Sequence, residues 1–316
     1  MFIDQLKANI KNKNIRIVFP ETHDQRVFDA AVRLANEKLC IPVMIGKASD
    51  YKGVDGMEFI DPESFVGLPQ LKASVLERRR GKSTAEEVDH LLSQPTFFGT
   101  ALVYTKQAQG LIAGATQSTG DTVRPALQLI KTKPSIAKTF GYFIMLRNNE
   151  IYLMGDCAIN PEPEAKDLAE FAVELSTIAT SYGIEPKIAM LSFSTKGSAN
   201  TPHTQKVQEA TALAKTLAPN IMIDGEMQFD AAVDQTVGQM KFPGSKVAGE
   251  ANVFVFPDLN SGNIGYKIAQ RLGGFEAVGP FLAGLNAPVN DLSRGCNEED
   301  VYKTAIVTAN QALINE

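Results

Sequence analysis

The segment IRIVFPETHDQRVFDAAVRLANEKL, residues 15–39, decides the fold class. Ile15–Phe19 is a short apolar, β-branched run that stops at Pro20, which is typical of a buried strand. Apolar residues then recur with helical spacing through Val27–Leu39, and Val43–Ile45 is a second strand-like run. A strand, a helix and another strand in this order predict parallel strand pairing with helices on both faces of the sheet.

The same alternation continues along the chain. The further strands that we expect are Gly110–Ala113, Ile188–Ser192, Ile221–Asp224, Val253–Phe256 and Ala277–Gly279. The further helices that we expect are Thr122–Thr132, Ala165–Tyr182, Gln205–Leu217, Asn263–Leu272 and Glu298–Ile314. Phe140–Leu146 and Ile151–Met154 flank Arg147–Glu150, whose asparagines predict a hairpin turn.

The hairpin interrupts the alternation, so we expect two α/β/α domains with mostly parallel sheets. The first would comprise residues 1–142 together with 296–316, because the last helix returns to it, and the second would comprise residues 143–295. A chain of 316 residues is long enough for two domains. Asp50–Leu71 is the loosest segment and is expected to be a surface excursion.

Composition excludes several classes of protein. The net charge of -5 argues against general affinity for nucleic acids. The uncharged stretches Gln107–Gly120 and Ala277–Asn290 are too short and too rich in glycine to span a membrane. Cys40, Cys157 and Cys296 are far apart, which argues against a disulfide framework or a zinc site and favours the reducing cytoplasm.

Common catalytic motifs are absent from the sequence. No two glycines have the G-x-G spacing of a dinucleotide-binding fold. Gly81-Lys82-Ser83 resembles the end of a phosphate-binding P-loop, but Leu76 stands where its first glycine should be. The three histidines, His23, His90 and His203, are isolated, so we expect them to be surface or capping residues and expect no metal site.

Four loops rich in small polar residues follow expected strands, namely 114–124 (GATQSTGDTVR), 192–199 (SFSTKGSA), 256–264 (FPDLNSGNI) and 290–300 (NDLSRGCNEED). In the first, the hydroxyls of Ser118 and Thr119 and the guanidinium of Arg124 could bind an anion at a helix start. An ordinary helix capped by Asp121 explains the same residues.

The fourth loop has the densest polar cluster. Ser293 and Arg294 precede a glycine, and Asp300 lies in the first turn of the last expected helix. Capping alone accounts for an acid at that position, so a catalytic role and a structural role both remain open for Asp300. Ligands of doubly wound folds bind where parallel strands end, and loops of this composition suit an anionic substrate such as a phosphate ester. Arg78–Arg80 adds a further cluster of positive charge.

These blocks resemble the phosphate acetyltransferase (phosphate acetyl/butyryltransferase) family. The resemblance rests on five segments in order: GATQSTGDTVRPALQ (114–128), AMLSFSTKGSA (189–199), DGEMQFDAA (224–232), GEANVFVFPDLNSGNIGYKIAQRL (249–272) and PVNDLSRGC (288–296). It implies an isocitrate dehydrogenase-like fold with the active site in the interdomain cleft, usually in a homodimer. It also implies reversible transfer of an acetyl group between coenzyme A and inorganic phosphate, with coenzyme A as a substrate and no prosthetic group.

The resemblance also implies roles for individual residues. The family's serine–arginine pair corresponds to Ser293 and Arg294, and its catalytic aspartate, seven residues after the serine, corresponds to Asp300. In the family mechanism this aspartate takes the thiol proton of coenzyme A, and the thiolate attacks acetyl phosphate directly. Two substrate-binding arginines correspond to Arg124 and, in the run Arg78–Arg80, to Arg78.

Two alternatives remain on the sequence alone. One is a phosphate butyryltransferase of the same superfamily, and the other is a non-catalytic module that senses coenzyme A or acetyl phosphate. A covalent route through Cys296 is a further possibility, since Arg294 and the helix start could stabilise a thiolate. We expect Cys296 to be a spectator.

Overall fold

The computed structural model describes residues 2–314. They form two compact units: the first unit runs to Thr132 and resumes at Leu285, and the second unit is Lys133–Gly284. No helix in the described part of the chain is long and apolar enough to cross a membrane.

The first unit is built on a five-stranded, wholly parallel sheet in the order β11-β4-β1-β2-β3. Its elements are α1 (Phe2–Ile10), β1 (Arg16–Phe19), α2 (Gln25–Asn36), β2 (Ile41–Ile45), the 3₁₀-helix η1 (Ala48–Asp50), β3 (Glu58–Ile60), α3 (Leu68–Arg78), α4 (Ala85–Leu92), α5 (Pro95–Tyr104), β4 (Gly110–Ala113), α6 (Thr119–Pro125), the π-helix η2 (Ala126–Ile130), β11 (Val289–Asp291) and α12 (Glu298–Ile314). All four residues of β4 are buried, as the centre of a parallel sheet requires.

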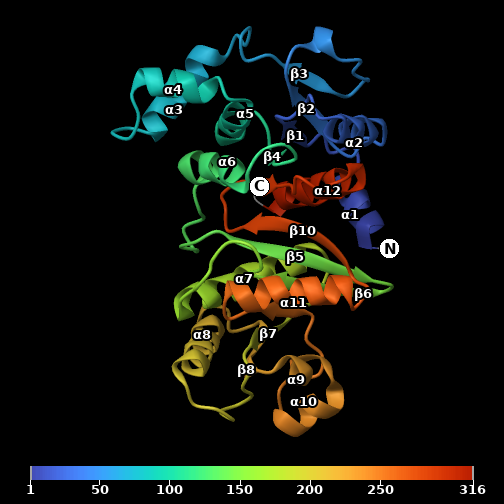
Figure 1. The fold of residues 1–316 in the computed structure, drawn as a ribbon, viewed down its shortest axis with the longest axis vertical. Helices are drawn as coiled ribbons and strands as arrows, with labels where there is room; N and C mark the ends of the chain where they lie inside the picture. Colours follow the sequence, from blue (N-terminus) through green and yellow to red (C-terminus); the bar gives the residue numbers. More distant parts are fainter. Residues whose placement is uncertain (1, 315–316) are drawn as a thin grey trace. The chain divides into compact units, whose positions relative to one another are not determined.

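Helix α12 belongs to the first unit although it follows the whole second unit in the sequence. It packs against α1, α2 and β4, and Figure 1 shows it in red beside the blue α1. Its side chains are buried at nearly every position from Val301 to Ala312. A helix buried on all sides is held by packing rather than by an amphipathic face.

The second unit contains a six-stranded mixed sheet in the order β10-β5-β6-β9-β7-β8. Its elements are β5 (Phe140–Arg147), β6 (Glu150–Gly155), α7 (Ala165–Ser181), β7 (Lys187–Leu191), α8 (Pro202–Leu217), β8 (Met222–Met227), α9 (Phe229–Val233), α10 (Gln235–Lys241), β9 (Val253–Val255), α11 (Leu259–Arg271) and β10 (Glu276–Ala283). The pairs β10–β5 and β5–β6 are antiparallel, and the remaining pairs are parallel.

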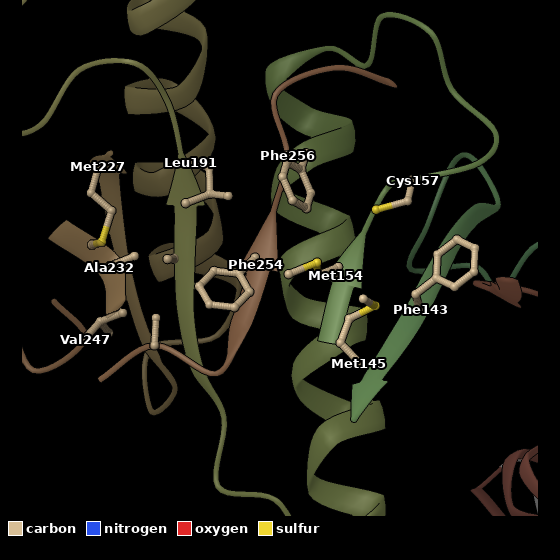
Figure 2. Close-up of a cluster of buried hydrophobic side chains, with 12 residues drawn as sticks. Phe143, Met145, Met154, Cys157, Leu191, Met227, Ala232, Val247, Phe254 and Phe256 are labelled. Atoms are coloured by element: carbon tan, nitrogen blue, oxygen red, sulfur yellow. The ribbon is translucent and has the colours of Figure 1, made fainter. Parts of the chain in front are cut away.

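One face of this sheet carries a core of sulfur-containing and aromatic side chains. Figure 2 shows Met154, Phe254 and Phe256 close together, with Leu191 on the neighbouring strand β7. Met154 of β6 lies opposite Phe254 of β9 in the strand register, so the contact follows from the parallel pairing. This pairing fixes the centre of the second unit's sheet.

The α/β class with mostly parallel sheets is confirmed, and so is the hairpin, which forms β5 and β6. The unit limits differ from the expected domain limits of 142/143 and 295/296. The first expected limit falls inside β5, which pairs with β6 and β10. The second assigns β11 to the second domain, although β11 pairs with β4 of the first unit. Strand pairing therefore moves both limits to positions before β5 and before β11.

One local expectation needs correction, and two features were not anticipated from the sequence. The helix expected over Thr122–Thr132 begins at Thr119, and it gives way after Pro125 to the π-helix η2 because proline cannot donate a backbone hydrogen bond. Asp50–Leu71 is not wholly irregular, since it holds η1 and β3. Helix α5 was not anticipated, because its sequence PTFFGTALVY is apolar and buried all round and has no helical period.

Candidate active site

The candidate site lies at the carboxyl ends of three adjacent strands of the first unit. The strand order β11-β4-β1 brings together the segments that follow Asp291, Ala113 and Phe19. Asp291 is opposite Ala113 in the register, and the Leu292 amide donates to the Ala113 carbonyl at 2.7 Å. The first and fourth polar loops of the sequence therefore start side by side, at the edge of the sheet where ligands of such folds bind.

A buried carboxylate anchors the loop after β4. Glu21, which is 2% exposed, accepts hydrogen bonds from the amides of Gly114 (2.8 Å), Ala115 (2.9 Å) and Thr116 (2.7 Å) and from the Thr116 hydroxyl (2.6 Å). Three successive amides on one carboxylate fix the direction in which the loop leaves the strand. The sequence analysis did not find Glu21, whose only signal was an acid directly after a buried strand.

Arg26 joins the three segments of the site. Its guanidinium pairs with Asp24 at 2.8 Å and donates to the carbonyls of Ala115 (3.0 Å), Arg294 (2.9 Å) and Cys296 (2.7 Å). The hydrogen bonds from Arg26 lower the pKa of Asp24. The planar, multidentate guanidinium is suited to this task, and a single ammonium group could not make the same set of bonds. Sequence reasoning also missed Arg26.

Helix α6 presents Ser118, Thr119 and Arg124, all of them exposed. Ser118 rather than Asp121 is the N-cap residue, since its amide and hydroxyl donate to the Asp121 carboxylate at 3.3 and 2.6 Å. The hydrogen bond from the Ser118 hydroxyl lowers the pKa of Asp121. The expectation that Asp121 caps the helix was wrong by three residues.

Arg124 lines a hollow of about 370 Å³ beside this helix. The walls combine the start of α5 (Pro95–Phe97) with Thr116, Gln117 and His23. His23 is exposed, as expected, and it lines the same hollow as Arg124, which the sequence did not suggest. Polar groups on apolar walls around one cation suit an anionic ligand with an apolar part.

Ser293, Arg294 and Asp300 follow one another in a tight turn and the start of α12. The Ser293 carbonyl accepts the Cys296 amide at 2.9 Å, and the Ser293 hydroxyl accepts the Gly295 amide at 3.2 Å. Asn297 and Asp300 form a reciprocal cap with distances of 2.9 and 3.0 Å. The side chains of Ser293, Arg294 and Asp300 are exposed, so all three are accessible to a substrate.

Glu299, next to Asp300, has a different environment. Its carboxylate pairs with Arg33 at 2.6 Å and with Lys303 at 3.4 Å. Partial burial acts to raise the pKa of Glu299, but the hydrogen bond from Arg33 and the nearby lysine outweigh it and lower the pKa. Glu299 therefore holds α12 against α2, whereas its neighbours Glu298 and Asp300 are exposed.

Cys296 is buried below the same turn. Burial raises the pKa of its thiol, Arg26 opposes the rise, and the Asp300 carboxylate adds to it. The thiolate that a covalent route requires is thus disfavoured.

Arg78 is not among the residues that line the hollow. Its guanidinium donates to the carbonyls of Leu129 (2.7 Å) and Ile130 (3.1 Å) and lies 5.1 Å from the centre of the Tyr104 ring. It thereby holds the helical segment that follows Arg124. Arg79 donates to the Ser83 hydroxyl at 3.1 Å, and Arg80 is exposed with no partner among residues 2–314.

Comparison with known proteins extends this description. A model of the phosphate acetyl/butaryl transferase family matches residues 1–309. The chain belongs to the phosphate acetyl/butaryl transferase family. It is therefore an acyltransferase. It is 52% identical over 321 residues to the phosphate acetyltransferase of Staphylococcus epidermidis and 51% identical over 316 residues to that of Bacillus subtilis, with 98% of each chain covered in both comparisons.

Solved structures agree with the assignment to this family. A phosphotransacetylase from Streptococcus pyogenes superposes with a TM-score of 0.96 at 50% identity, covering 99% of this chain and 98% of that one. A putative 4-hydroxythreonine-4-phosphate dehydrogenase from Salmonella typhimurium, at 13% identity and a TM-score of 0.52 over 95% of this chain and 99% of that one, shares the fold alone. In the described part of the chain, no three His, Cys, Asp or Glu side chains gather as a metal-binding group would require.

Proposed function

We propose that the protein is a phosphate acetyltransferase, which converts acetyl-CoA and phosphate reversibly into acetyl phosphate and CoA. The observation that carries the proposal is the constellation Ser293, Arg294 and Asp300, exposed together beside the Arg124 loop in a chain about half identical to phosphate acetyltransferases. Coenzyme A would be a substrate and no prosthetic group would take part. The cytoplasm is the proposed location.

The proposed mechanism is direct transfer in a ternary complex. Asp300 takes the proton of the CoA thiol, and the sulfur attacks the carbonyl carbon of acetyl phosphate. The C–S bond forms, the C–O bond to phosphate breaks, and phosphate leaves as the anion. The Asp300 cap is compatible with this role, because Oδ2 accepts the Asn297 amide and Oδ1 is left to face the thiol.

Ser293 and Arg294 would stabilise the charge that develops in the transition state. The Ser293 hydroxyl accepts one bond, from the Gly295 amide, and its own proton remains available for the carbonyl oxygen. Arg294 is held through its carbonyl by Arg26, so its exposed side chain projects from a fixed backbone. A guanidinium suits a leaving phosphate because it donates in two directions.

Arg124, Ser118 and Thr119 would bind the phosphate groups of the substrates, with the hollow beside Arg124 accepting part of the ligand. For Arg78 we propose a contact through Nη1, since its Nε and Nη2 donate to backbone carbonyls. This contact would add to the structural role of Arg78 in holding the segment after Arg124.

The test is an arsenolysis assay with purified protein and no added metal. Arsenate replaces phosphate, the acetyl arsenate that forms hydrolyses spontaneously to acetate and arsenate, and acetyl-CoA is consumed continuously. We expect arsenate-dependent loss of acetyl-CoA that is faster than loss of butyryl-CoA. Folded protein that consumes neither thioester would overturn the proposal, and a preference for butyryl-CoA would replace it with a butyryltransferase.

We also propose that the protein is a homodimer. Helix α11 of the second unit exposes a stripe of Ile264 (56% exposed), Ile268 (54%) and Leu272 (84%) at intervals of four residues. Such a stripe can pair with its own copy about a two-fold axis. Light scattering should give the mass of a dimer, and Leu272→Glu should shift it toward the monomer. A monomeric parent protein would refute this part.

A further inference from the structure

Three buried side-chain atoms in the described part of the chain have no hydrogen-bond partner: Arg16 Nε, Thr122 Oγ1 and Asp291 Oδ1. Buried polar groups are almost always paired, so each exception needs a physical explanation. Thr122 and Asp291 both belong to the base of the candidate active site, since Asp291 ends β11 and Thr122 lies in α6. The mechanism above uses neither residue.

Other buried carboxylates of the chain are well supplied with donors. Glu21 accepts four hydrogen bonds, and Asp156, which is 1% exposed, accepts the amides of Gly141, Ala158, Ile159 and Asn160 at 2.7–3.0 Å. Asp291 is 6% exposed and has no comparable set. Asp291 therefore differs from Glu21 and Asp156, whose hydrogen bonds explain why they are buried.

Asp291 lies at the point where the two loops of the site touch. Gly114 has a φ of 108°, and a Cβ there would lie 2.7 Å from the Leu292 carbonyl oxygen, 2.8 Å from the Leu292 nitrogen and closer still to Asp291 Oδ1. Only glycine fits this contact. The Asp291 carboxyl thus lies between Gly114, which starts the 114–118 loop before α6, and the start of the Ser293–Arg294 turn.

The surroundings of Asp291 favour its neutral form. Burial raises the pKa of its carboxyl, the hydroxyls of Thr119 and Thr122 oppose the rise, and the nearby Glu21 carboxylate adds to it. A neutral carboxyl carries an O–H that can donate to the Thr122 hydroxyl oxygen. An ionised carboxylate would be repelled by the nearby Glu21 carboxylate, and only the hydroxyls of Thr119 and Thr122 would stabilise it.

The other charged groups on the neighbouring elements are engaged or exposed. Asp121 and Arg124 on α6 are exposed, and strand β4 contributes no titratable group. In the first turn of α12, Glu298 and Asp300 are exposed and Glu299 pairs with Arg33.

We propose that Asp291 is a positioning residue of the acyl-transfer site, whose buried carboxyl sets the spacing between the 114–118 loop, which leads into α6, and the Ser293–Arg294 turn. The substrate would touch those loops and not Asp291 itself. The inference rests on the proposed function, because the two loops carry its substrate contacts.

The test compares Asp291→Asn with Asp291→Ala, and exposed Asp29→Asn serves as a control. The asparagine keeps the shape of the neutral acid, so we expect kcat within about 3-fold of the parent at low pH. The alanine leaves a gap between the loops, and we expect kcat to fall about 10- to 100-fold with a smaller change in the KM for CoA, because small misplacements of reacting groups are costly. Asp29→Asn should match the parent in every readout.

The pH dependence gives a second readout that does not need the alanine variant to fold. Because the pKa of Asp291 is raised on folding, its contribution to stability is full below the ordinary aspartate range near 3.8 and is lost as pH rises through the folded value. Asp291→Asn should therefore gain in stability and in kcat relative to the parent as pH rises through that window.

An alanine variant with the parent's kcat would overturn the inference, as would an asparagine variant whose kcat and stability follow the parent at every pH. An asparagine variant as impaired as the alanine one at all pH values would also overturn it, since the ionised carboxylate would then be required. These failures occur with an active parent. Failure of the proposed function is distinct, because the parent itself would then transfer no acetyl group.

Discussion

The loop after β4 in the first unit and the loop after β7 in the second are each anchored on one buried glutamate. Glu21 accepts the amides of the first loop, and Glu226, which is 2% exposed, accepts the Gly197 amide and the Ser194 hydroxyl, both at 2.8 Å. In the second loop the polar side chains then satisfy one another, since the hydroxyls of Ser194 and Ser198 lie 3.1 Å apart.

The first loop leaves its cation free. Arg124 is exposed and, like Arg294 beside the same sheet edge, makes no ion pair within residues 2–314. The second loop also carries an exposed cation, Lys196, but its ammonium group lies 5.0 Å from the centre of the Phe242 ring, whereas Arg124 lines a hollow that can admit a ligand. Composition alone does not distinguish the two cases, because both loops are rich in serine, threonine and glycine.

The largest effect is expected for Asp300→Asn. Loss of the proton acceptor should lower kcat about 10²- to 10⁴-fold with little change in the KM for CoA, because the base acts on the thiol and not on binding. Steady-state kinetics with acetyl phosphate and CoA measure both quantities. Glu299→Gln is the matched control and should keep kcat within about 2-fold, since the exposed pair with Arg33 contributes little. Equal losses in the two variants would remove Asp300 as the base.

Arg26→Lys should lower kcat/KM about 10- to 100-fold, because an ammonium group cannot hold the carbonyls of Ala115, Arg294 and Cys296 together. Arg147→Lys is its counterpart in the second unit, where Arg147 donates to the Gly273 carbonyl at 2.9 Å and pairs with Glu150. That variant should keep kcat/KM within about 2-fold. If both substitutions had the same effect, the contacts of Arg26 with the three carbonyls would not be needed for catalysis.

Glu21→Gln should lower the free energy of unfolding by about 2 kcal/mol, because both carboxylate oxygens accept hydrogen bonds and the amide replaces one of these acceptors with a donor. Glu226→Gln should cost less, because the Gly197 amide and the Ser194 hydroxyl both donate to Oε1, which the amide oxygen can replace. Denaturant unfolding of the two variants tests whether the anchors differ in this way. A much smaller loss for Glu21→Gln would mean that the loop after β4 is held chiefly by Arg26.

Cys296→Ala should have the smallest effect, with kcat within about 2-fold of the parent. The raised pKa of the buried thiol argues against a thiolate nucleophile. Loss of nearly all activity in a variant of normal thermal stability would restore the covalent route.

Sequence periodicity was sufficient for much of the fold. The strand–helix alternation predicted the parallel sheets, and helix α12 was expected over Glu298–Ile314, the range that it occupies. Helix α5 was missed because a helix buried on every side has no polar face to reveal its period. Strand β11 was missed because three residues are too few to form a pattern.

For the site, the sequence supplied the exposed residues and not their supports. Ser293, Arg294 and Asp300 all lie within the segment 290–300, so one stretch of sequence contains them. Glu21 and Arg26 act on partners 93 and 268 positions away, and no local pattern contains that information. Asp291 belongs to the segment 288–296 that carries the family resemblance, but the sequence does not single it out. Its burial and the unpaired Oδ1 atom are visible only in the structure.

The position of β11 also has a consequence for biosynthesis. Strand β4 is complete at Ala113, but its partner β11 begins at Val289, so a nascent chain exposes one edge of β4 throughout synthesis of the second unit. At about 5–20 residues per second, the ribosome needs roughly 10 to 40 s to make the residues after Thr132. During that interval the first unit lacks a strand, a covering helix and half of its candidate site. We expect the nascent chain to be most prone to aggregation then, and catalytic competence to appear only after β11 and α12 have been made.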